Sequence, residues 1–473
     1  MDLIINMDIM DTMGKKILVL GGGTAGWLTA LYLTKTFPHH NITLMESKPI
    51  GILGAGEGST PHLTQFLHML DVDLNELLKE CKGTIKQGIS FENWNGDNQK
   101  YFHPFAVQNQ YRHFSIDNLF GYECYDYYLK HLIHRKMPLK DYTYSSIQSY
   151  KNVIDTVNID HSIHFDAHLL ADYLKKITKV NKHIYDELRK VKHDEQGNII
   201  QVNDIECDFV FDCTGFRREL IGKVYNSEWK SYQNHLPIKK AIPFFLPTDN
   251  KPYTQAIAMK YGWVWKIPLQ HRYGAGYIFD SDYISEEDAF NEAKQMFPDI
   301  EYTRTIKFDA GRYKQTWIKN CIAVGLSSGF TEPLEATSIW MATEQLKLIE
   351  TFVDVMFSNN KDAKEEYNNI IANNNDMVME FLYFHYMTKR NDSPFWKEFR
   401  DKNYFSEFEY KLKQIEQGNL RWYHTTKNDI TSTFNLMSWL HVGEGLGLIK
   451  QMSITGYENL VPSVEEYGKN LPR

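Results

Sequence analysis

A glycine-rich turn between an apolar strand and a helix is the feature that most restricts the fold of this chain. Lys15–Leu20 is predicted to be a buried strand, Thr24–Phe37 a helix, and Asn41–Met45 a second strand. The turn reads Gly-Gly-Gly-Thr-Ala-Gly at residues 21–26. Strand, helix and parallel strand within about 30 residues form a βαβ unit with a right-handed crossover. The sequence therefore predicts an α/β fold with a Rossmann-like parallel or mixed sheet.

The same turn fits the dinucleotide-binding pattern GxGxxG. The first glycine of the pattern makes the tight turn, the second lets the backbone approach a pyrophosphate, and the third lets the helix pack on the strand. The first N–H groups of the helix then face the phosphate. The predicted cofactor-binding residues in the turn are Gly21, Gly23, Thr24, Ala25 and Gly26.

Glu46 ends the second strand, 20 residues after Gly26. An acidic side chain at this place accepts hydrogen bonds from an adenosine ribose. Phe209–Phe211 and Ile322–Val324 are two further short apolar strands, which we expect to return to the first sheet. The segments that contain or follow them, Asp208–Phe216 and Ala323–Pro333, resemble the strand-then-glycine segments that close over the flavin in FAD-containing monooxygenase-like folds. We therefore predict FAD as the cofactor, with Leu326 as a further contact.

Composition and charge exclude several other classes of protein. The chain has 473 residues, with 52 Lys and Arg against 60 Asp and Glu, and no basic block typical of a nucleic-acid binder. Ile17–Thr34 is an 18-residue stretch without charge, but the three consecutive glycines at 21–23 would interrupt a membrane-spanning helix. The five cysteines form no CxxC pair or metal-binding cluster, so we expect no metal site and a reducing, cytoplasmic location.

The remaining pattern suggests how the chain divides. Gln255–Pro268 alternates as antiparallel strands do, and Pro61–Cys81 is predicted as two short helices. Three longer helices are predicted at Ser338–Phe357, Ala363–Met387 and Asn403–Gln417. We predict a discontinuous FAD-binding module over residues 14–360, with substrate-site insertions at about 80–160. A mainly helical substrate-binding module would cover residues 361–473.

Five segments share one resemblance: GGGTAGW at Gly21–Trp27, GTIKQGISFENW around Lys86, WVWKIP at Trp263–Pro268, GFTEPLEATS at Gly329–Ser338 and HYMTKRNDSPFW at His385–Trp396. Together they resemble the flavin-dependent halogenases of the tryptophan-halogenase type, from about residue 15 to about residue 450. WVWKIP is the most discriminating segment, because aromatic-hydroxylating flavoproteins that share the nucleotide fold lack it.

This resemblance implies a reaction in two places. A separate NAD(P)H-dependent flavin reductase supplies FADH2, and hypohalous acid forms from O2 and a halide co-substrate at the flavin. The acid then crosses an internal tunnel and halogenates an electron-rich small aromatic such as an indole, phenol or heteroaromatic. The alternatives are a regioselective halogenase of free tryptophan, an aromatic-hydroxylating flavin monooxygenase and a catalytically silent flavin-binding protein. A homo-oligomer is compatible with the sequence.

Two residues match the family's catalytic pair. Lys86 matches the lysine that holds or is halogenated by hypohalous acid, and the apolar residues around it predict that it is buried. Glu335 matches the glutamate that polarises the electrophile and accepts the ring proton. Glu332 is a competing carboxylate, which we rank below Glu335.

Thr337 and Ser338 match the positions whose backbone N–H groups are expected to bind the halide. The family commonly has serine where Ala336 stands and often has glycine where Ser338 stands. The first difference removes a hydroxyl group that could bind substrate. The second changes the volume of the halide pocket.

Aromatic side chains are predicted to shape the substrate site. His103 and Phe105 match an HxF element that contacts the aromatic substrate, and Trp439 is a further candidate for stacking. Trp263 and Trp265 lie two residues apart on one strand, so they share a face. We expect these two tryptophans to form an apolar wall beside the flavin.

Overall fold

The computed structural model describes residues 14–48, 56–105, 144–401, 406–416, 434 and 436–449. Residues 106–143 of the predicted insertion, Cys124 among them, lie outside these ranges, as do residues 450–473 of the predicted C-terminal module. None of the helices in the described ranges combines the length and apolar composition that a bilayer crossing requires. The uncharged stretch Ile17–Thr34 instead contains a strand, the glycine turn and most of a helix.

The first βαβ unit is present and forms the middle of a six-stranded sheet. β1 pairs in parallel with β2 and with β12, and helix α1 (Thr24–Thr36) connects β1 to β2. The predicted α/β fold is therefore confirmed, and the two later apolar segments return to this sheet as expected. The strand order is β20 (Trp317–Ile318), β21 (Cys321–Ala323), β12 (Phe209–Asp212), β1 (Lys16–Leu20), β2 (Asn41–Glu46) and β8 (Lys182–Tyr185).

A seven-stranded sheet forms the other large layer of the molecule. Its pairs are antiparallel except for β15 with β5, which are parallel. The predicted antiparallel strands within Gln255–Pro268 are confirmed as β15 and β16. The order is β18 (Ile306–Lys307), β14 (Lys240–Leu246), β17 (Tyr273–Phe279), β16 (Gly262–Pro268), β15 (Thr254–Ala258), β5 (Gly88–Glu92) and β6 (Lys100–Pro104).

Three small sheets complete the strands of the described ranges. One of them carries Lys86 and consists of β3 (Glu57–Gly58), β7 (Ser162–Phe165) and β4 (Thr84–Lys86). The other two are β11 (Ile205–Glu206), β10 (Ile199–Val202) and β9 (Val191–His193), and then β13 (Trp229–Ser231), β19 (Gly311–Tyr313) and β22 (Gly329–Phe330).

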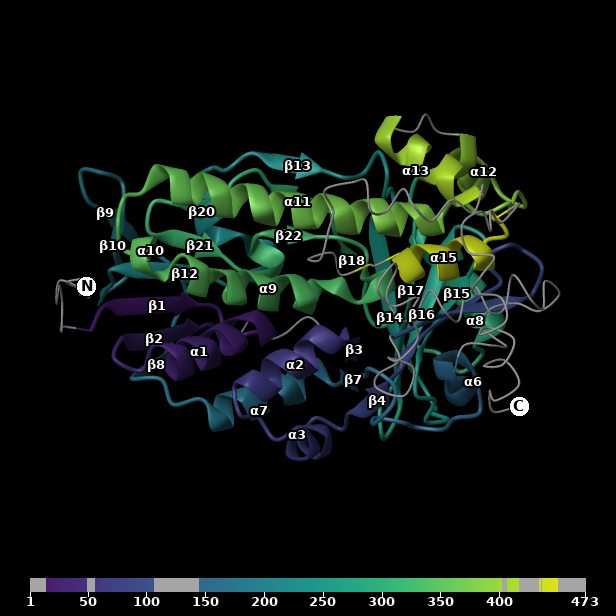
Figure 1. The fold of residues 1–473 in the computed structure, drawn as a ribbon, viewed down its shortest axis with the longest axis horizontal. Helices are drawn as coiled ribbons and strands as arrows, with labels where there is room; N and C mark the ends of the chain where they lie inside the picture. The colour runs from purple at the N-terminus through teal and green to yellow at the C-terminus, as the bar shows by residue number, and fades with distance from the viewer. Residues whose placement is uncertain are drawn as a thin grey trace, which may run out of the picture.

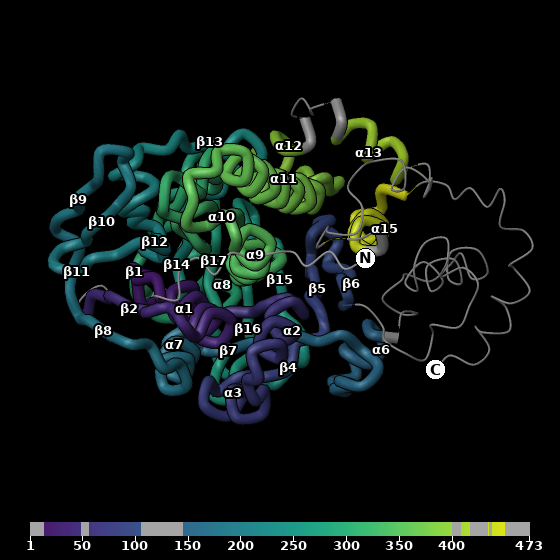
Figure 2. Tube along the Cα trace, turned by 60° about the vertical axis from the view of Figure 1, so that its left-hand side comes forward, coloured from purple at the N-terminus to yellow at the C-terminus, as the bar shows by residue number. Residues whose placement is uncertain are grey.

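Two long helices, α9 (Thr337–Thr351) and α11 (Lys361–His385), run side by side along the long axis, from the six-stranded sheet toward the seven-stranded sheet (Figure 1). Figure 2 shows α15 (Leu436–Gly445) beside β5 and β6, at the far end from β8. The remaining helices are α2 (Pro61–Met69), α3 (Leu74–Glu80), α6 (Tyr144–Tyr150), α7 (Ala167–Ile177), α8 (Glu286–Met296), α10 (Val353–Met356), α12 (Pro394–Asp401) and α13 (Ser406–Glu416).

Helix boundaries follow local sequence in two instructive places. α3 begins after Asp73, whose carboxylate accepts from the N–H groups of Asn75 and Glu76, so the predicted break in this region has a capping cause. The helix predicted at Ser338–Phe357 is instead interrupted at Phe352. Phe352 lies between Thr351 and Val353, and all three have low helix propensity. Its ring packs edge-on against Trp317, which holds the interruption in the core.

Candidate functional site

The glycine turn has the geometry that its sequence predicts. Gly21 has φ +117°, and a Cβ there would lie 2.2 Å from the carbonyl oxygen of Cys213. A Cβ on Gly26 would lie 1.9 Å from the carbonyl oxygen of Gly21, whereas a Cβ on Gly23 would meet nothing within 4 Å. Gly26 thus lets helix and strand pack closely, and Gly23 opens onto free space at the start of α1.

A cavity of about 610 Å³ runs from this turn to Lys86. Most of the predicted cofactor-binding residues line it, namely Gly21, Gly23, Thr24, Ala25, Glu46 and Leu326. The structure places Gly26 in the packing behind the turn instead. Trp263 and Trp265 both line the cavity, so the predicted shared face of β16 is present.

The Glu46 carboxylate lies next to the glycine turn. A Cβ on Gly22 would lie 1.8 Å from Glu46 Oε2, which shows how closely the carboxylate approaches. Its Oε1 lies 2.7 Å from His183 Nε2 and 3.7 Å from Lys175 Nζ. His183 and Lys175 therefore hold one carboxylate oxygen while the other faces the turn.

Lys86 lines the same cavity and is fully buried. Its Nζ donates to the carbonyl oxygen of Ser59 at 3.0 Å and lies 5.3 Å from the centre of the Phe105 ring. Burial lowers the pKa of Lys86 to about 8, although the charge of Glu335 acts in the opposite direction. A lysine with such a pKa has both an ammonium and an amine population near neutral pH.

Glu335 belongs to a short 3-10 turn, Pro333–Glu335, that separates two environments. Leu334 and Ala336 line the cavity, whereas the Glu335 carboxylate contacts His103 and His385. Its oxygens lie 2.9 Å and 3.0 Å from His103 Nδ1, and Oε1 lies 2.9 Å from His385 Nε2. The carboxylate therefore faces the histidines from behind the cavity wall.

These contacts determine the charge of Glu335. Burial on its own favours the neutral acid, but the interactions with His103 and then His385 outweigh it and lower the pKa of Glu335 to about 2. Glu335 is therefore a carboxylate at neutral pH, held ionised in a site where it is 3% exposed. A buried carboxylate in this form is able to accept a proton.

The three residues predicted to contact the substrate do not all lie at the same distance from Lys86 and Glu335. Phe105 lies beside Lys86, and His103 contacts Glu335 and packs at 5.7 Å against the Phe381 ring. Trp439 packs against the same Phe381 ring at 5.1 Å. His103 is thus close enough to orient Glu335. Trp439 lies one ring further away and contacts the Phe381 ring.

The predicted halide-binding residues start α9. Ala336 precedes the helix with φ +56°, an unusual conformation for a residue with a side chain, and in the described chain no side chain caps this helix. Ser338 and Ile339 line the cavity, while Thr337 is fully buried with its hydroxyl 3.3 Å from that of Thr331. The first N–H groups of α9 thus lie beside the cavity.

Three residues at the site, His385, Tyr386 and His164, had no role predicted from the sequence. His385 and Tyr386 were part of the family-like HYMTKRNDSPFW segment, but nothing in their spacing indicated which carboxylate each would contact. His164 is the third. It faces Thr84, and β7 places it between β3 and β4.

The hydrogen bonds of His164 fix its ring. Thr84 Oγ1 donates to the carbonyl oxygen of Pro268 at 2.7 Å, so it accepts from His164 Nδ1 at 2.9 Å. His164 Nε2 then accepts from the Thr254 hydroxyl at 2.9 Å. Burial, helped by Lys86, lowers the pKa of His164 well below its usual value, so the ring is neutral. Lys86 therefore has a neutral neighbour.

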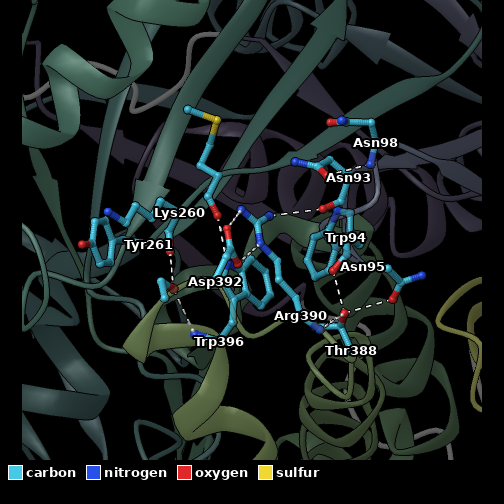
Figure 3. Close-up of polar contacts among 12 residues, drawn as sticks. Asn93, Trp94, Asn95, Asn98, Lys260, Tyr261, Thr388, Arg390, Asp392 and Trp396 are labelled. Atoms are coloured by element: carbon cyan, nitrogen blue, oxygen red, sulfur yellow. Dashed lines mark hydrogen bonds and ion pairs between the residues drawn. The ribbon is translucent and has the colours of Figure 1, made fainter.

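The segment after α11 is fastened to two hairpin turns (Figure 3). Arg390 forms an ion pair with Asp392 at 2.6 and 2.8 Å and donates to the carbonyl oxygen of Asn93 at 3.2 Å. Thr388 Oγ1 donates to the carbonyl oxygen of Trp94 at 2.6 Å. These contacts join the segment to the turn after β5.

The second half of the segment reaches the turn before β16 (Figure 3). Ser393 Oγ donates to the carbonyl oxygen of Lys260 at 2.7 Å, and Trp396 Nε1 donates to that of Met259 at 2.9 Å. Because His385 and Tyr386 immediately precede the segment, its attachment at both ends fixes them in place.

Comparisons with known proteins agree with this geometry. A family model described as tryptophan halogenase matches residues 16–459. The tryptophan 6-halogenase SttH of Streptomyces toxytricini is 32% identical over 423 residues, which cover 81% of this chain and 80% of that protein. The tryptophan 7-halogenase RebH of Lentzea aerocolonigenes is 29% identical over 490 residues, which cover 92% and 90%.

A solved structure shows the same fold over nearly the full length. BrvH, a flavin-dependent halogenase from Brevundimonas sp. BAL3, superposes with a TM-score of 0.83 at 26% sequence identity. The match covers 97% of this chain and 96% of that one.

Proposed function

This chain belongs to the tryptophan halogenase family and is a flavin-dependent halogenase, and we propose that it uses reduced FAD, O2 and a halide ion to halogenate an electron-rich aromatic small molecule. One observation carries the proposal. One cavity is lined by both the glycine turn and Lys86, and the turn Pro333–Glu335 lies between this cavity and the buried, ionised carboxylate of Glu335. This arrangement suits an electrophile that forms in one place and reacts in another.

The residues present fit a flavin dinucleotide. Gly23 opens onto free space at the start of α1, where backbone N–H groups can bind a pyrophosphate, and Glu46 lies where a ribose would need an acceptor. Trp263 and Trp265 give the cavity an apolar wall. When bound, reduced FAD would supply the reducing equivalents that activate O2 toward halide, and a separate flavin reductase would supply it.

The start of α9 is our candidate for holding the halide. Its N–H groups at Thr337 and Ser338 are left without a side-chain cap in the described chain, and the helix dipole favours an anion there. Ser338 lines the cavity, so its hydroxymethyl group would touch the anion pocket. Ion size should therefore affect binding.

Lys86 and Glu335 would carry the transfer to the ring. The Lys86 side chain would bind hypohalous acid through its ammonium or accept the halogen on its amine, with Phe105 beside it. Glu335 would take the proton that the ring loses, and His103 and His385 would hold its carboxylate in place. His103 would thus orient Glu335 as well as contact the substrate.

The decisive experiment supplies the enzyme with FAD, a flavin reductase, NADH, bromide and an indole, and measures product mass. A bromine isotope pattern that disappears when bromide is omitted is the expected result. A product heavier by one oxygen would instead indicate a hydroxylating monooxygenase. No product from any aromatic would favour a silent flavin-binding protein.

Free tryptophan is the second candidate substrate, because SttH and RebH are named as tryptophan halogenases. We propose simple indoles and phenols ahead of it. Among the described residues of the C-terminal region, the buried Lys411 ammonium donates to Glu380 Oε2 at 2.8 Å, so these two charges already contact each other, and Phe434 and Trp439 add aromatic surface. A zwitterion buried without matched partners costs several kcal/mol.

Side-by-side kinetics separate the two candidates. With equal reductase and halide supply, kcat/KM should be at least about tenfold higher for simple indoles than for free tryptophan, since a mismatch of about 1.4 kcal/mol gives that ratio. Faster reaction of free tryptophan, with a single regioisomer, would establish the second candidate.

A further inference from the structure

Glu332 lies three residues before Glu335 and is fully buried, but its surroundings are different. Its Oε2 accepts a short hydrogen bond from the Tyr386 hydroxyl. Its Oε1 has no hydrogen-bond partner among the described residues. Consecutive residues at the end of α11 thus contact the two glutamates, His385 reaching Glu335 and Tyr386 reaching Glu332.

The hydrogen bonds continue from Glu332 to the cavity wall. Trp263 Nε1 donates to the Tyr386 hydroxyl at 3.0 Å, and that hydroxyl donates to Glu332. The Tyr386 ring also stacks on Phe399 at 4.3 Å. The direction of both donors leaves Glu332 as the terminal acceptor of a chain that begins at Trp263.

This environment favours a neutral carboxyl group. An ionised carboxylate buried with an unpartnered oxygen is far more costly than a buried hydroxyl without an acceptor. Burial raises the pKa of Glu332 to about 8, the Tyr386 and Trp263 contacts act against that rise, and Asp280 adds to it.

Among the residues that the structure describes, the other titratable groups nearby do not supply a counter-charge to Glu332. Asp280 follows β17 and is itself acidic, and Lys239 Nζ lies 3.9 Å from its Oδ1. His103 and His385 both contact Glu335. Glu335 is therefore ionised because two histidines contact it, whereas Glu332 is neutral because no cation contacts it among the described residues.

We propose that Glu332 is a positioning residue, which in its neutral form holds Tyr386 and, through Tyr386, the indole ring of Trp263 at the cavity wall. The inference deepens the proposed function and rests on it, because the wall would keep water away from the place where the oxidant forms. Loss of the chain of bonds would loosen Trp263 and let oxidant escape unused.

Substitutions distinguish this role from a charged, catalytic one. Glu332→Gln keeps the shape, the carbonyl acceptor and the neutral state, so halogenated product per O2 consumed should stay close to wild type. Glu332→Ala and Tyr386→Phe each break the chain, and this yield should fall by about fivefold, as expected for a lost hydrogen bond of ordinary strength. The missing oxygen should appear as hydrogen peroxide.

The contrary results are equally definite. If Glu332→Gln lowers the yield as much as Glu335→Gln does, Glu332 acts as a charge and the inference is wrong. An unchanged yield in Tyr386→Phe would overturn it as well.

A second measurement uses the flavin-free protein and does not depend on halogenation. A folded-state pKa raised from 4.5 to about 8 means that Glu332 stabilises the fold fully below about pH 4.5 and that this stabilisation is lost as pH rises toward 8. Glu332→Gln has no such loss, so its melting temperature relative to wild type should climb steadily from pH 5 to pH 8. A difference that stays constant over this range would overturn the inference even if the enzyme proves to be a halogenase.

Discussion

The two ends of the cavity are built in opposite ways. At the glycine end, the turn and the Glu46 carboxylate come from one continuous stretch, residues 21–46, in which a turn, a helix and a strand follow one another. The lysine end is assembled from separate parts of the chain: β4 provides Lys86, β6 provides His103, the turn at Pro333–Glu335 provides the carboxylate and α11 provides His385. His103 and Glu335 are 232 positions apart in sequence.

The difference affects how each end responds to mutation. Steric limits on the backbone define the glycine end, so an added methyl group there should disturb packing or cofactor binding. Buried charges define the lysine end, so a change of charge there should alter chemistry while the cofactor still binds. Comparing variants from the two ends tests whether these two functions are separable.

The largest effect is expected for Lys86→Ala. Halogenation should fall by roughly 10³-fold or more, within the range that a positioned acid–base group contributes, because nothing is left to hold the electrophile beside the ring. FAD binding and hypohalous acid formation should persist, since the glycine end is untouched. Product yield, flavin titration and trapping of hypohalous acid by a small scavenger measure the three quantities. Halogenation near the wild-type rate would show that Lys86 is not the transfer residue.

Glu335→Gln should have the next largest effect. The amide keeps the shape of the side chain but cannot accept the ring proton, so we expect a loss of about 10²-fold in halogenation. Its matched control is Glu332→Gln, the same change three residues away. Equal losses in the two variants would mean that the carboxylates are not distinguished as the structure suggests.

The glycine end of the cavity could be predicted from the sequence more fully than the lysine end. The βαβ unit and its GxGxxG turn could be predicted because strand, turn and helix are local, and Gly21 needs its positive φ whatever the rest of the chain does. The short apolar runs of β12 and β21 also returned to the sheet as expected. The domain boundary at residue 361 stays a prediction. Helix α11, which begins there, contacts α9 and β20 on the side of the predicted nucleotide site, and its last residue, His385, contacts Glu335.

The lysine end was only partly predictable. Family-like motifs selected Lys86 and Glu335, and their catalytic roles stay predictions that the experiments above test. No periodicity in the sequence could show that His103 would face Glu335. Nor could it show that His385 would contact Glu335 while Tyr386 contacts Glu332. These contacts depend on where α11 ends, which is set by long-range packing and by the fastening of residues 388–396 (Figure 3).

A smaller effect is expected at the glycine end. Gly26→Ala should destabilise the flavin-free protein by about 1–3 kcal/mol, because its Cβ would press on the backbone of Gly21 at 1.9 Å. Gly23→Ala is the matched control: its Cβ meets nothing within 4 Å, so stability should stay unchanged while FAD affinity falls. Thermal melts and flavin titrations measure the two effects. Equal melting temperatures for the two variants would contradict this assignment.

The smallest effect concerns stability in acid. A folded-state pKa lowered from 4.5 to about 2 means that Glu335 stabilises the fold above about pH 4.5 and that this stabilisation is lost as pH falls toward 2. The melting-temperature advantage of wild type over Glu335→Gln should therefore shrink, on the order of a few degrees, between pH 6 and pH 3.5. Glu332→Gln changes the pH dependence at the opposite end of the scale. Parallel acid profiles for wild type and Glu335→Gln would show that His103 and His385 do not hold Glu335 ionised, and the contrast between the two glutamates would lose its electrostatic basis.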